Sequence, residues 1–309
     1  MNVIRALKPV AGYLWRLPLC AFAYVGGAMA GGALISALGL PLPEVPEQAD
    51  GRIMGLCLFI GSLALAAGLA PLAKRIQGPC WARWLILAAL CYVCLGVTVP
   101  LEGAIFTTLD GMASIPVFSI PPCLLFAAVT VLLFKPASRG DSFAATARRF
   151  FAGRSVRGWA GRLALAVCAF PVIYWTFGMM VAPFVMEYYK QGQFALATPH
   201  PGVIVSMQFL RSVLFLVVAM PILVAWSGSR RHLVLALGLA FYVLVGLFDL
   251  IQTYWLAPTL LVLHNVEILV DSLVYALALT WLLAPRDEAK ADEPLAPRLL
   301  CVRQAPTVN

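Results

Sequence analysis

Three ionisable side chains interrupt the last long apolar segment of the chain, which runs from Thr259 to Ala284. His264, Glu267 and Asp271 are spaced three and four residues apart, so on an α-helix they form one polar stripe. An imidazole and carboxylates in this arrangement can act as general acid and base or bind a charged ligand. Ionisable groups at membrane depth are energetically unfavourable and must face protein or a water-filled cavity. The stripe therefore predicts a functional site.

The two preceding apolar segments carry polar residues at a similar depth. Gln208 and Arg211 are three residues apart, and so are Asp249 and Gln252. At a rise of 1.5 Å per residue, Arg211, Asp249 and Glu267 lie roughly 12, 9 and 12 Å from the same face of the membrane. This common level predicts one pocket between the three segments. Its expected ligand-binding residues are Gln208, Arg211, Asp249, Gln252, His264, Glu267 and Asp271.

The permanent charge of Arg211 demands a carboxylate partner, and Glu267 or Asp249 fits by depth. A further buried carboxylate without a partner would take up a proton or hold a cation. Glu102 is the comparable acid of the first half of the chain and lies at a similar depth. The alternative is that these groups only bond helices to one another in lipid, at about 0.6–2 kcal/mol each.

The composition is typical of a membrane protein. Of the 309 residues, 62% are hydrophobic and 12% are charged, against about 45–50% and about 25% in a soluble domain. Eight apolar runs are long enough to cross a bilayer as α-helices. They cover about residues 13–40, 52–72, 82–108, 113–134, 161–185, 203–226, 231–255 and 259–284. We therefore expect an all-α, polytopic membrane protein whose main partner is the lipid bilayer.

The basic residues predict the orientation. The net charge is +8, but 19 of the 22 Lys and Arg residues lie on one side of the membrane. Such a one-sided distribution sets the orientation of a membrane protein, and it argues against binding to nucleic acid. Both termini are then cytoplasmic, and the pocket faces outward. The excess of Arg over Lys, 17 to 5, is typical of a GC-rich bacterial genome, so we expect a multi-pass protein of the bacterial cytoplasmic (inner) membrane.

A shift of 150 residues brings seven identical residues of the second and third spans onto the sixth and seventh without a gap. The matched residues are Ser62, Pro71, Leu85, Leu87, Tyr92, Val93 and Gly96 with Ser212, Pro221, Leu235, Leu237, Tyr242, Val243 and Gly246. The match predicts two parallel four-helix repeats, residues 1–134 and 161–285. Gly61 aligns with Arg211, so the first half is expected to be scaffold and the second to hold the chemistry.

Three further segments carry structural expectations. Residues 135–160 form a basic, amphipathic cytoplasmic linker, in which Phe143, Phe150 and Phe151 share a helical face expected to lie on anionic headgroups. Residues 286–309 form a polar tail that is expected to be disordered. Gly27 and Gly31 form a small-residue face, which favours tight helix packing within the chain over dimerisation.

These features leave three classes of function open. The first is an integral membrane protein whose outward-facing polar pocket binds or transports a small charged solute or a lipid headgroup. The alternative is a metal- or acid/base-dependent enzyme acting on a lipid-linked substrate, in which Asp249, Asp271 or His200 could complete a metal site with His264 and Glu267. The third is an assembly factor that uses the basic linker. The sequence names no cofactor and commits no residue to a metal.

Overall fold

The structure is a computed structural model that describes residues 12–41, 44, 49–136 and 142–285. Within these residues the secondary structure is helical apart from two isolated β-bridges. Eight helical segments are long and apolar enough to cross a membrane, which confirms the all-α, eight-span prediction. They cover Gly12–Ala37, Gly51–Arg75, Cys80–Phe106, Met112–Leu133, Val156–Lys190, Pro201–Ala225, Arg230–Gln252 and Pro258–Leu283. The expected tail, residues 286–309, lies outside the described residues.

The observed spans agree with the expected ones to within five residues, and the largest difference is at α9 (Val156–Lys190). This helix starts five residues early because Ser155 caps it by accepting a hydrogen bond from the backbone of Gly158. It also continues past the apolar run through polar residues to Lys190. At 35 residues it is roughly 52 Å long, well beyond the thickness of the hydrocarbon core.

Four spans come from each half of the chain. The first four are α2 (Arg16–Ala37), α3 (Gly51–Arg75), the series α4 (Cys80–Cys91), η1 (Tyr92–Thr98) and α5 (Val99–Phe106), and the series η2 (Met112–Ser114), α6 (Ile115–Phe118) and α7 (Ile120–Leu133). The last four are α9, α10 (Pro201–Ala225), the series α11 (Arg230–Tyr242), η4 (Val243–Leu247) and α12 (Phe248–Gln252), and α13 (Pro258–Leu283). The short η3 (Gln193–Ala195) lies between α9 and α10.

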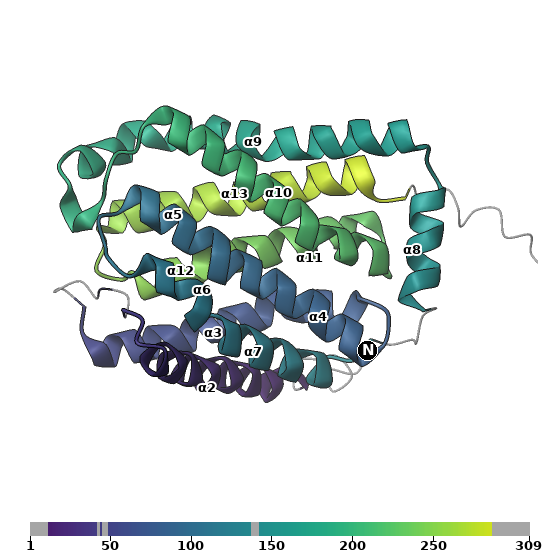
Figure 1. The fold of residues 1–309 in the computed structure, drawn as a ribbon, viewed down its shortest axis with the longest axis horizontal. Helices are drawn as coiled ribbons and strands as arrows, with labels where there is room; N and C mark the ends of the chain where they lie inside the picture. The colour runs from purple at the N-terminus through teal and green to yellow at the C-terminus, as the bar shows by residue number, and fades with distance from the viewer. Residues whose placement is uncertain (1–11, 42–43, 45–48, 137–141, 286–309) are drawn as a thin grey trace, which may run out of the picture.

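The helices form one bundle in which the two sets of four meet along central helices. Helix α2 packs on α3 and α7, and α9 packs on α10 and α13. Contacts of α3 with α11 and of α4 with α10 join the two sets. The linker helix α8 (Phe143–Ala152) lies across one end of this bundle (Figure 1). We call that end the α8 end and the opposite one the distal end.

The connections that follow α3 and α10 pair with each other. Ile76 and Trp226 form an antiparallel β-bridge. The backbone N–H of Gln77 donates to Ala225 O at 2.8 Å, and that of Ser227 donates to Arg75 O at 2.9 Å. Each connection therefore satisfies backbone groups of the other. This pairing fixes α3 and α4 relative to α10 and α11.

The apolar face of α8 packs against the bundle. Phe150 is buried with its ring 5.2 Å from that of Trp159, and Phe143 packs against the same core. Arg148 is exposed. The expectation that the apolar face rests on lipid headgroups is therefore wrong for Phe143 and Phe150, because the end of the bundle itself offers apolar surface to cover.

Arginines near the α8 end bind the last carbonyl groups of α13. Arg154, Arg162 and Arg230 donate hydrogen bonds to the carbonyl oxygens of residues 283, 282 and 284 at 2.7, 2.5 and 2.9 Å. The last four carbonyls of a helix lack partners within it and carry partial negative charge. Part of the basic charge at this end thus completes hydrogen bonding within the protein.

Helix α2 packs closely against the fourth span at two glycines. A Cβ atom at Gly27 would lie 2.3 Å from Cα of Pro122, and one at Gly31 would lie 2.3 Å from the carbonyl oxygen of Phe118. No real Cβ atom could occupy either place without moving backbone. The prediction that these glycines serve tight packing within the chain is confirmed.

Replacing Gly27 by leucine is expected to lower the free energy of unfolding by about 1–3 kcal/mol, because the side chain would meet backbone that cannot rotate away. Gly26→Leu is the matched control, since a Cβ at Gly26 has nothing within 4 Å and exposed substitutions change stability by only about 0.5 kcal/mol. Equilibrium unfolding in detergent micelles measures both. Equal losses of stability in the two variants would contradict the close contact between Gly27 and the fourth span.

Candidate functional site

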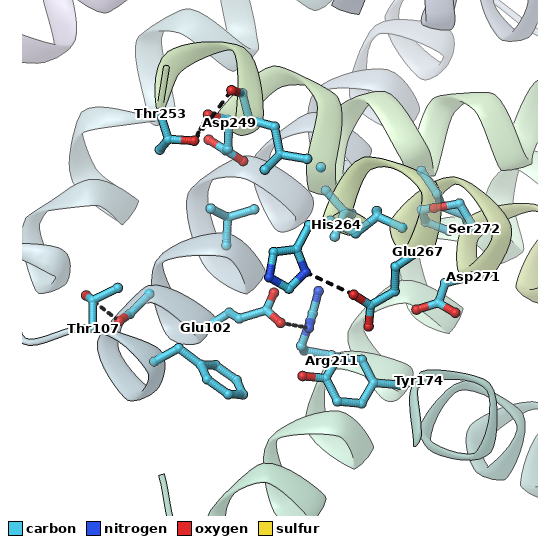
Figure 2. Close-up of a pocket in the computed structure, with 18 of the residues that line it drawn as sticks. Glu102, Thr107, Tyr174, Arg211, Asp249, Thr253, His264, Glu267, Asp271 and Ser272 are labelled. Atoms are coloured by element: carbon cyan, nitrogen blue, oxygen red, sulfur yellow. Dashed lines mark hydrogen bonds and ion pairs between the residues drawn. The ribbon is translucent and has the colours of Figure 1, made fainter. Parts of the chain in front are cut away.

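A cavity of about 290 Å³ lies toward the distal end, between α5, α9, α10, α12 and α13 (Figure 2). Five of the seven expected site residues line it together. These are Arg211, Asp249, His264, Glu267 and Asp271. The depths counted along separate helices therefore identified residues that line one cavity.

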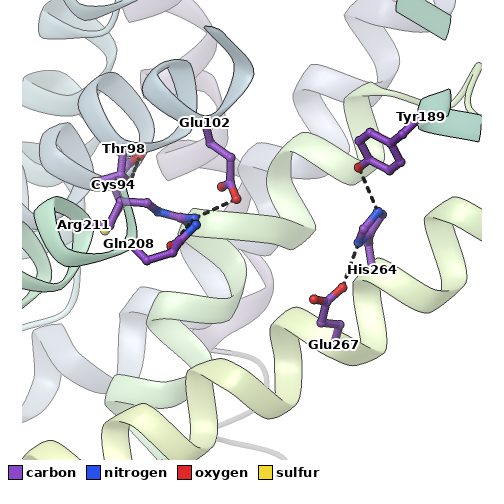
Figure 3. A network of polar contacts seen from close by, with 8 residues as sticks. All are labelled: Cys94, Thr98, Glu102, Tyr189, Gln208, Arg211, His264 and Glu267. Carbon is purple, nitrogen blue, oxygen red and sulfur yellow. Dashed lines mark hydrogen bonds and ion pairs between the residues drawn. The ribbon is translucent and has the colours of Figure 1, made fainter. Parts of the chain in front are cut away.

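Arg211 forms its ion pair with Glu102, at 2.7 Å between Nη1 and Oε1 (Figure 3). The partners expected from the sequence, Glu267 and Asp249, are not the ones found. Helix α5 packs beside α10, so the acid of the first half lies closest to the guanidinium. The similar depth of Glu102 is the signal in the sequence that marks it as a candidate partner. The first half therefore contributes a charged group to the cavity wall.

The guanidinium of Arg211 is held by further contacts. Its Nη1 donates to Oε1 of Gln208 at 3.2 Å, and its Cζ lies 5.4 and 5.6 Å from the ring centroids of Phe170 and Phe215. Gln208 is fully buried and lies behind Arg211, outside the cavity lining. Only 2% of Arg211 is exposed, so its charge is fixed in one position by an acid, an amide and two aromatic faces.

His264 is held between a carboxylate and a phenol. Its Nδ1 lies 2.9 Å from Oε2 of Glu267, one helical turn further along α13. Its Nε2 lies 3.4 Å from the hydroxyl of Tyr189, near the end of α9. Figure 3 shows the three side chains in sequence. This arrangement orients the imidazole between a phenol and a carboxylate.

Two carboxyl groups of the cavity take part in no ion pair with a described residue. Oδ2 of Asp249 and Oδ1 of Asp271 are buried and have no hydrogen-bond partner among the residues that the structure covers. Gln252, expected beside Asp249, instead donates to the carbonyl oxygen of Phe248 at 3.3 Å and does not line the cavity.

Four aromatic rings close the cavity toward the α8 end. They come from α9, α10, α11 and α13, and they are Phe170, Phe215, Phe241 and Tyr275. Neighbouring ring centroids are 5.0 Å apart for Phe170 and Phe215, 5.3 Å for Phe215 and Phe241, and 5.9 Å for Phe241 and Tyr275. All four side chains are buried. We call this layer the aromatic floor.

At the distal end, two chain connections meet beside the cavity. Thr107 and Leu196 form an antiparallel β-bridge, and both residues line the cavity. Thr108 N–H donates to Ala195 O at 2.8 Å. Phe194 and Ala195 have φ of 56° and 59°, in the left-handed region that non-glycine residues rarely adopt. The bridge holds this strained turn against the end of α5.

The seventh span changes its helical winding at the level of the cavity. Its π-helical segment η4 contributes Val245 and Gly246 to the lining. A Cβ at Gly246 would lie 2.7 Å from Cγ2 of Ile268, so α13 approaches this segment closely. Short π-helical segments recur at functional sites. Here the segment directly precedes α12 and Asp249.

His200, one of three residues that could complete a metal site with His264 and Glu267, has another role in the fold. Nδ1 of His200 accepts a hydrogen bond from the backbone N–H of Gly202 at 3.1 Å and so caps α10. Among the residues described by the structure, no group of three or more His, Cys, Asp or Glu side chains is placed to hold a metal ion.

The fold and its eight apolar spans define an α-helical, multi-pass integral membrane protein. Comparisons of the chain with protein-family models, curated proteins and solved structures find no match.

Proposed function

We propose that this protein binds or transports a small charged solute or a lipid headgroup through the cavity beneath its distal end. The observation that supports this most directly is the gathering of six ionisable groups from four spans around one space of about 290 Å³. Bonding helices together needs fewer groups and uses uncharged ones. Ionisable residues within membrane spans are typical of ligand and ion pathways.

A two-fold repeat underlies this proposal. Residues 1–134 and 161–285 are proposed to be parallel repeats joined by the linker 135–160. In support, α3 and α10 have bounds that differ by 150 residues at both ends, and the bridged residues Ile76 and Trp226 are also 150 apart. The π-helical segments η1 and η4 fall at corresponding places in the third and seventh spans.

We propose that the protein lies in a bacterial cytoplasmic membrane with both termini in the cytoplasm and the distal end outside. The distribution of basic residues supports this orientation. The arginines near the α8 end match it, since they lie where cytoplasmic positive charge is expected. In this orientation, the cavity receives its ligand from the outer side, and the aromatic floor separates it from the cytoplasm.

Filling the cavity is expected to abolish ligand binding without unfolding the protein. In Val99→Trp, an indole replaces a side chain that lines the cavity. Val217→Trp is the matched control, because Val217 on α10 is exposed and lies outside the lining. We expect charged solutes or headgroup lipids that raise the Tm of the wild type and of Val217→Trp to leave the Tm of Val99→Trp unchanged. Stabilisation that survives in Val99→Trp would place the ligand elsewhere and refute the proposal.

A membrane-embedded acid/base enzyme is the second candidate. The contacts of His264 with Glu267 and Tyr189 favour it, because a carboxylate that orients an imidazole is a recurrent device in proton transfer. The two functions differ in one observable: an enzyme changes the bound molecule, whereas a binding or transport protein releases it unchanged.

A further inference from the structure

Acidic side chains outnumber basic ones around the cavity. Four carboxylates, those of Glu102, Asp249, Glu267 and Asp271, face one arginine and one histidine. Glu102 pairs with Arg211, and Glu267 pairs with His264. Asp249 and Asp271 remain. Asp249 interacts electrostatically with Glu102, and Asp271 with Glu267, Arg211 and Glu102. A bound cation, or protons on the two unpaired acids, would balance this cluster.

Asp271 shows where such a charge would bind. Only 6% of this residue is exposed, it lines the cavity, and its Oδ1 is buried without a partner among the described residues. A buried carboxyl oxygen without a hydrogen-bond donor is strongly unfavourable. Asp249 presents a second such oxygen from α12, on another wall of the same cavity. A ligand that carries N–H donors and positive charge would satisfy both requirements.

The rest of the lining suits the body of an organic ion. Seven phenylalanines and tyrosines line the cavity, namely Phe106, Phe170, Tyr174, Tyr189, Phe215, Phe241 and Tyr275. Aromatic faces attract cations and also bury hydrocarbon. At about 30 Å³ for each water-sized group, the cavity of about 290 Å³ admits on the order of ten non-hydrogen atoms.

An anion fits this space poorly. The single arginine is already neutralised by Glu102 at 2.7 Å. An anionic ligand would have to displace Glu102 while it approached three other acids, and it would be repelled by each acid that is ionised where water is excluded.

We propose that the cavity takes an organic cation, an ammonium group on an aliphatic or aromatic body of about ten non-hydrogen atoms, whose charge is held at Asp271, with Asp249 acting on it from another wall of the cavity. This inference rests on the proposed function and names its ligand class. The ammonium group belongs either to a free amine or to the headgroup of a lipid such as phosphatidylethanolamine, and the test distinguishes the two.

The test uses the full chain in a non-ionic detergent with three matched probes: phenethylamine, the neutral 2-phenylethanol and the anionic 3-phenylpropanoate. We expect phenethylamine to bind and raise the Tm, and the neutral and anionic probes to bind at least about tenfold more weakly. Asp271→Asn and Asp249→Asn, which keep side-chain size, are each expected to weaken phenethylamine binding by about tenfold or more. Asp110→Asn, an exposed acid outside the lining, is expected to leave it unchanged.

Lipid-doped micelles separate the two sources of the ammonium group. If the ligand is a headgroup, phosphatidylethanolamine raises the Tm in a way that depends on Asp271, phosphatidylglycerol does not, and phenethylamine competes with the lipid. If it is a free amine, phenethylamine acts alone. Either result supports the cation assignment. Asp249→Asn keeps the test decisive if Asp271→Asn does not fold.

Two results overturn the cation assignment. Binding of phenethylamine that both Asp→Asn variants retain would show that the carboxylates do not hold it. Binding of 3-phenylpropanoate or phosphatidylglycerol, blocked by Val99→Trp, would also overturn the assignment but would leave the proposed function intact. If no charged solute or lipid binds in a Val99→Trp-sensitive way, the proposed function fails together with the inference.

Discussion

Glu102→Gln is expected to lower the free energy of unfolding by about 3–5 kcal/mol, because it leaves the buried guanidinium of Arg211 without its carboxylate. Arg211 cannot lose its proton to escape this penalty, and only 2% of it is exposed. Equilibrium unfolding in detergent micelles gives the value. The matched control is Glu187→Gln, since Glu187 is exposed and bonds locally to Gln191 at 2.6 Å; its change should stay within about 0.5 kcal/mol.

A double-mutant cycle tests the same pair. Arg211→Met in the Glu102→Gln background removes the orphaned charge, so we expect it to recover much of the lost stability. Glu267→Gln should cost less than Glu102→Gln, because the partner of Glu267 is a histidine that can become neutral. Two results would contradict the assignment: additive effects at Glu102 and Arg211, or a larger effect at Glu267 than at Glu102.

The spans were predictable because lipid offers the backbone no hydrogen-bond partners. Each apolar run must satisfy its own hydrogen bonds as a helix, so hydropathy located all eight spans to within five residues. The depth of a residue was predictable for a related reason, since the rise per residue in a helix is nearly constant. This is why Arg211, Asp249 and Glu267 fell at one level and line one cavity.

The neighbours of each residue were not predictable from depth. Glu102 lies beside Arg211 because α5 packs on α10. Counting residues along a single helix cannot predict a contact between two helices. The direction in which Gln252 points was missed for a local reason. Gln252 is the last residue of α12, and its side-chain amide bonds back to the carbonyl oxygen of Phe248, so it does not reach the cavity although Asp249, one turn earlier, lines it. The aromatic floor gave no signal, because its residues are ordinary members of an apolar pattern.

Phe248→Ala is expected to lower the free energy of unfolding by about 3–5 kcal/mol, because it empties a tightly packed space in the core. Phe248 is 4% exposed, and its ring lies 5.1 Å from that of Tyr24 in an edge-on arrangement. A Cβ at Gly61 would lie 2.9 Å from Cδ2 of Phe248. Phe184→Ala is the matched control, because that ring is 64% exposed and its loss leaves no internal cavity.

Gly61→Leu separates space filling from other effects of the substitution. In the wild type, the leucine would collide with Phe248 and lower stability by about 1–3 kcal/mol. In Phe248→Ala it would occupy the vacated space, so the same substitution should raise stability. Helix propensity alone cannot reverse sign between the two backgrounds, and a loss in both would show that Phe248 does not fill this space. Gly61 aligns with Arg211 at a shift of 150 residues. Under the proposed repeat the two positions correspond, and they differ in what fills the space beside them. Phe248 fills the space beside Gly61, whereas Arg211 itself lines the cavity and pairs with Glu102.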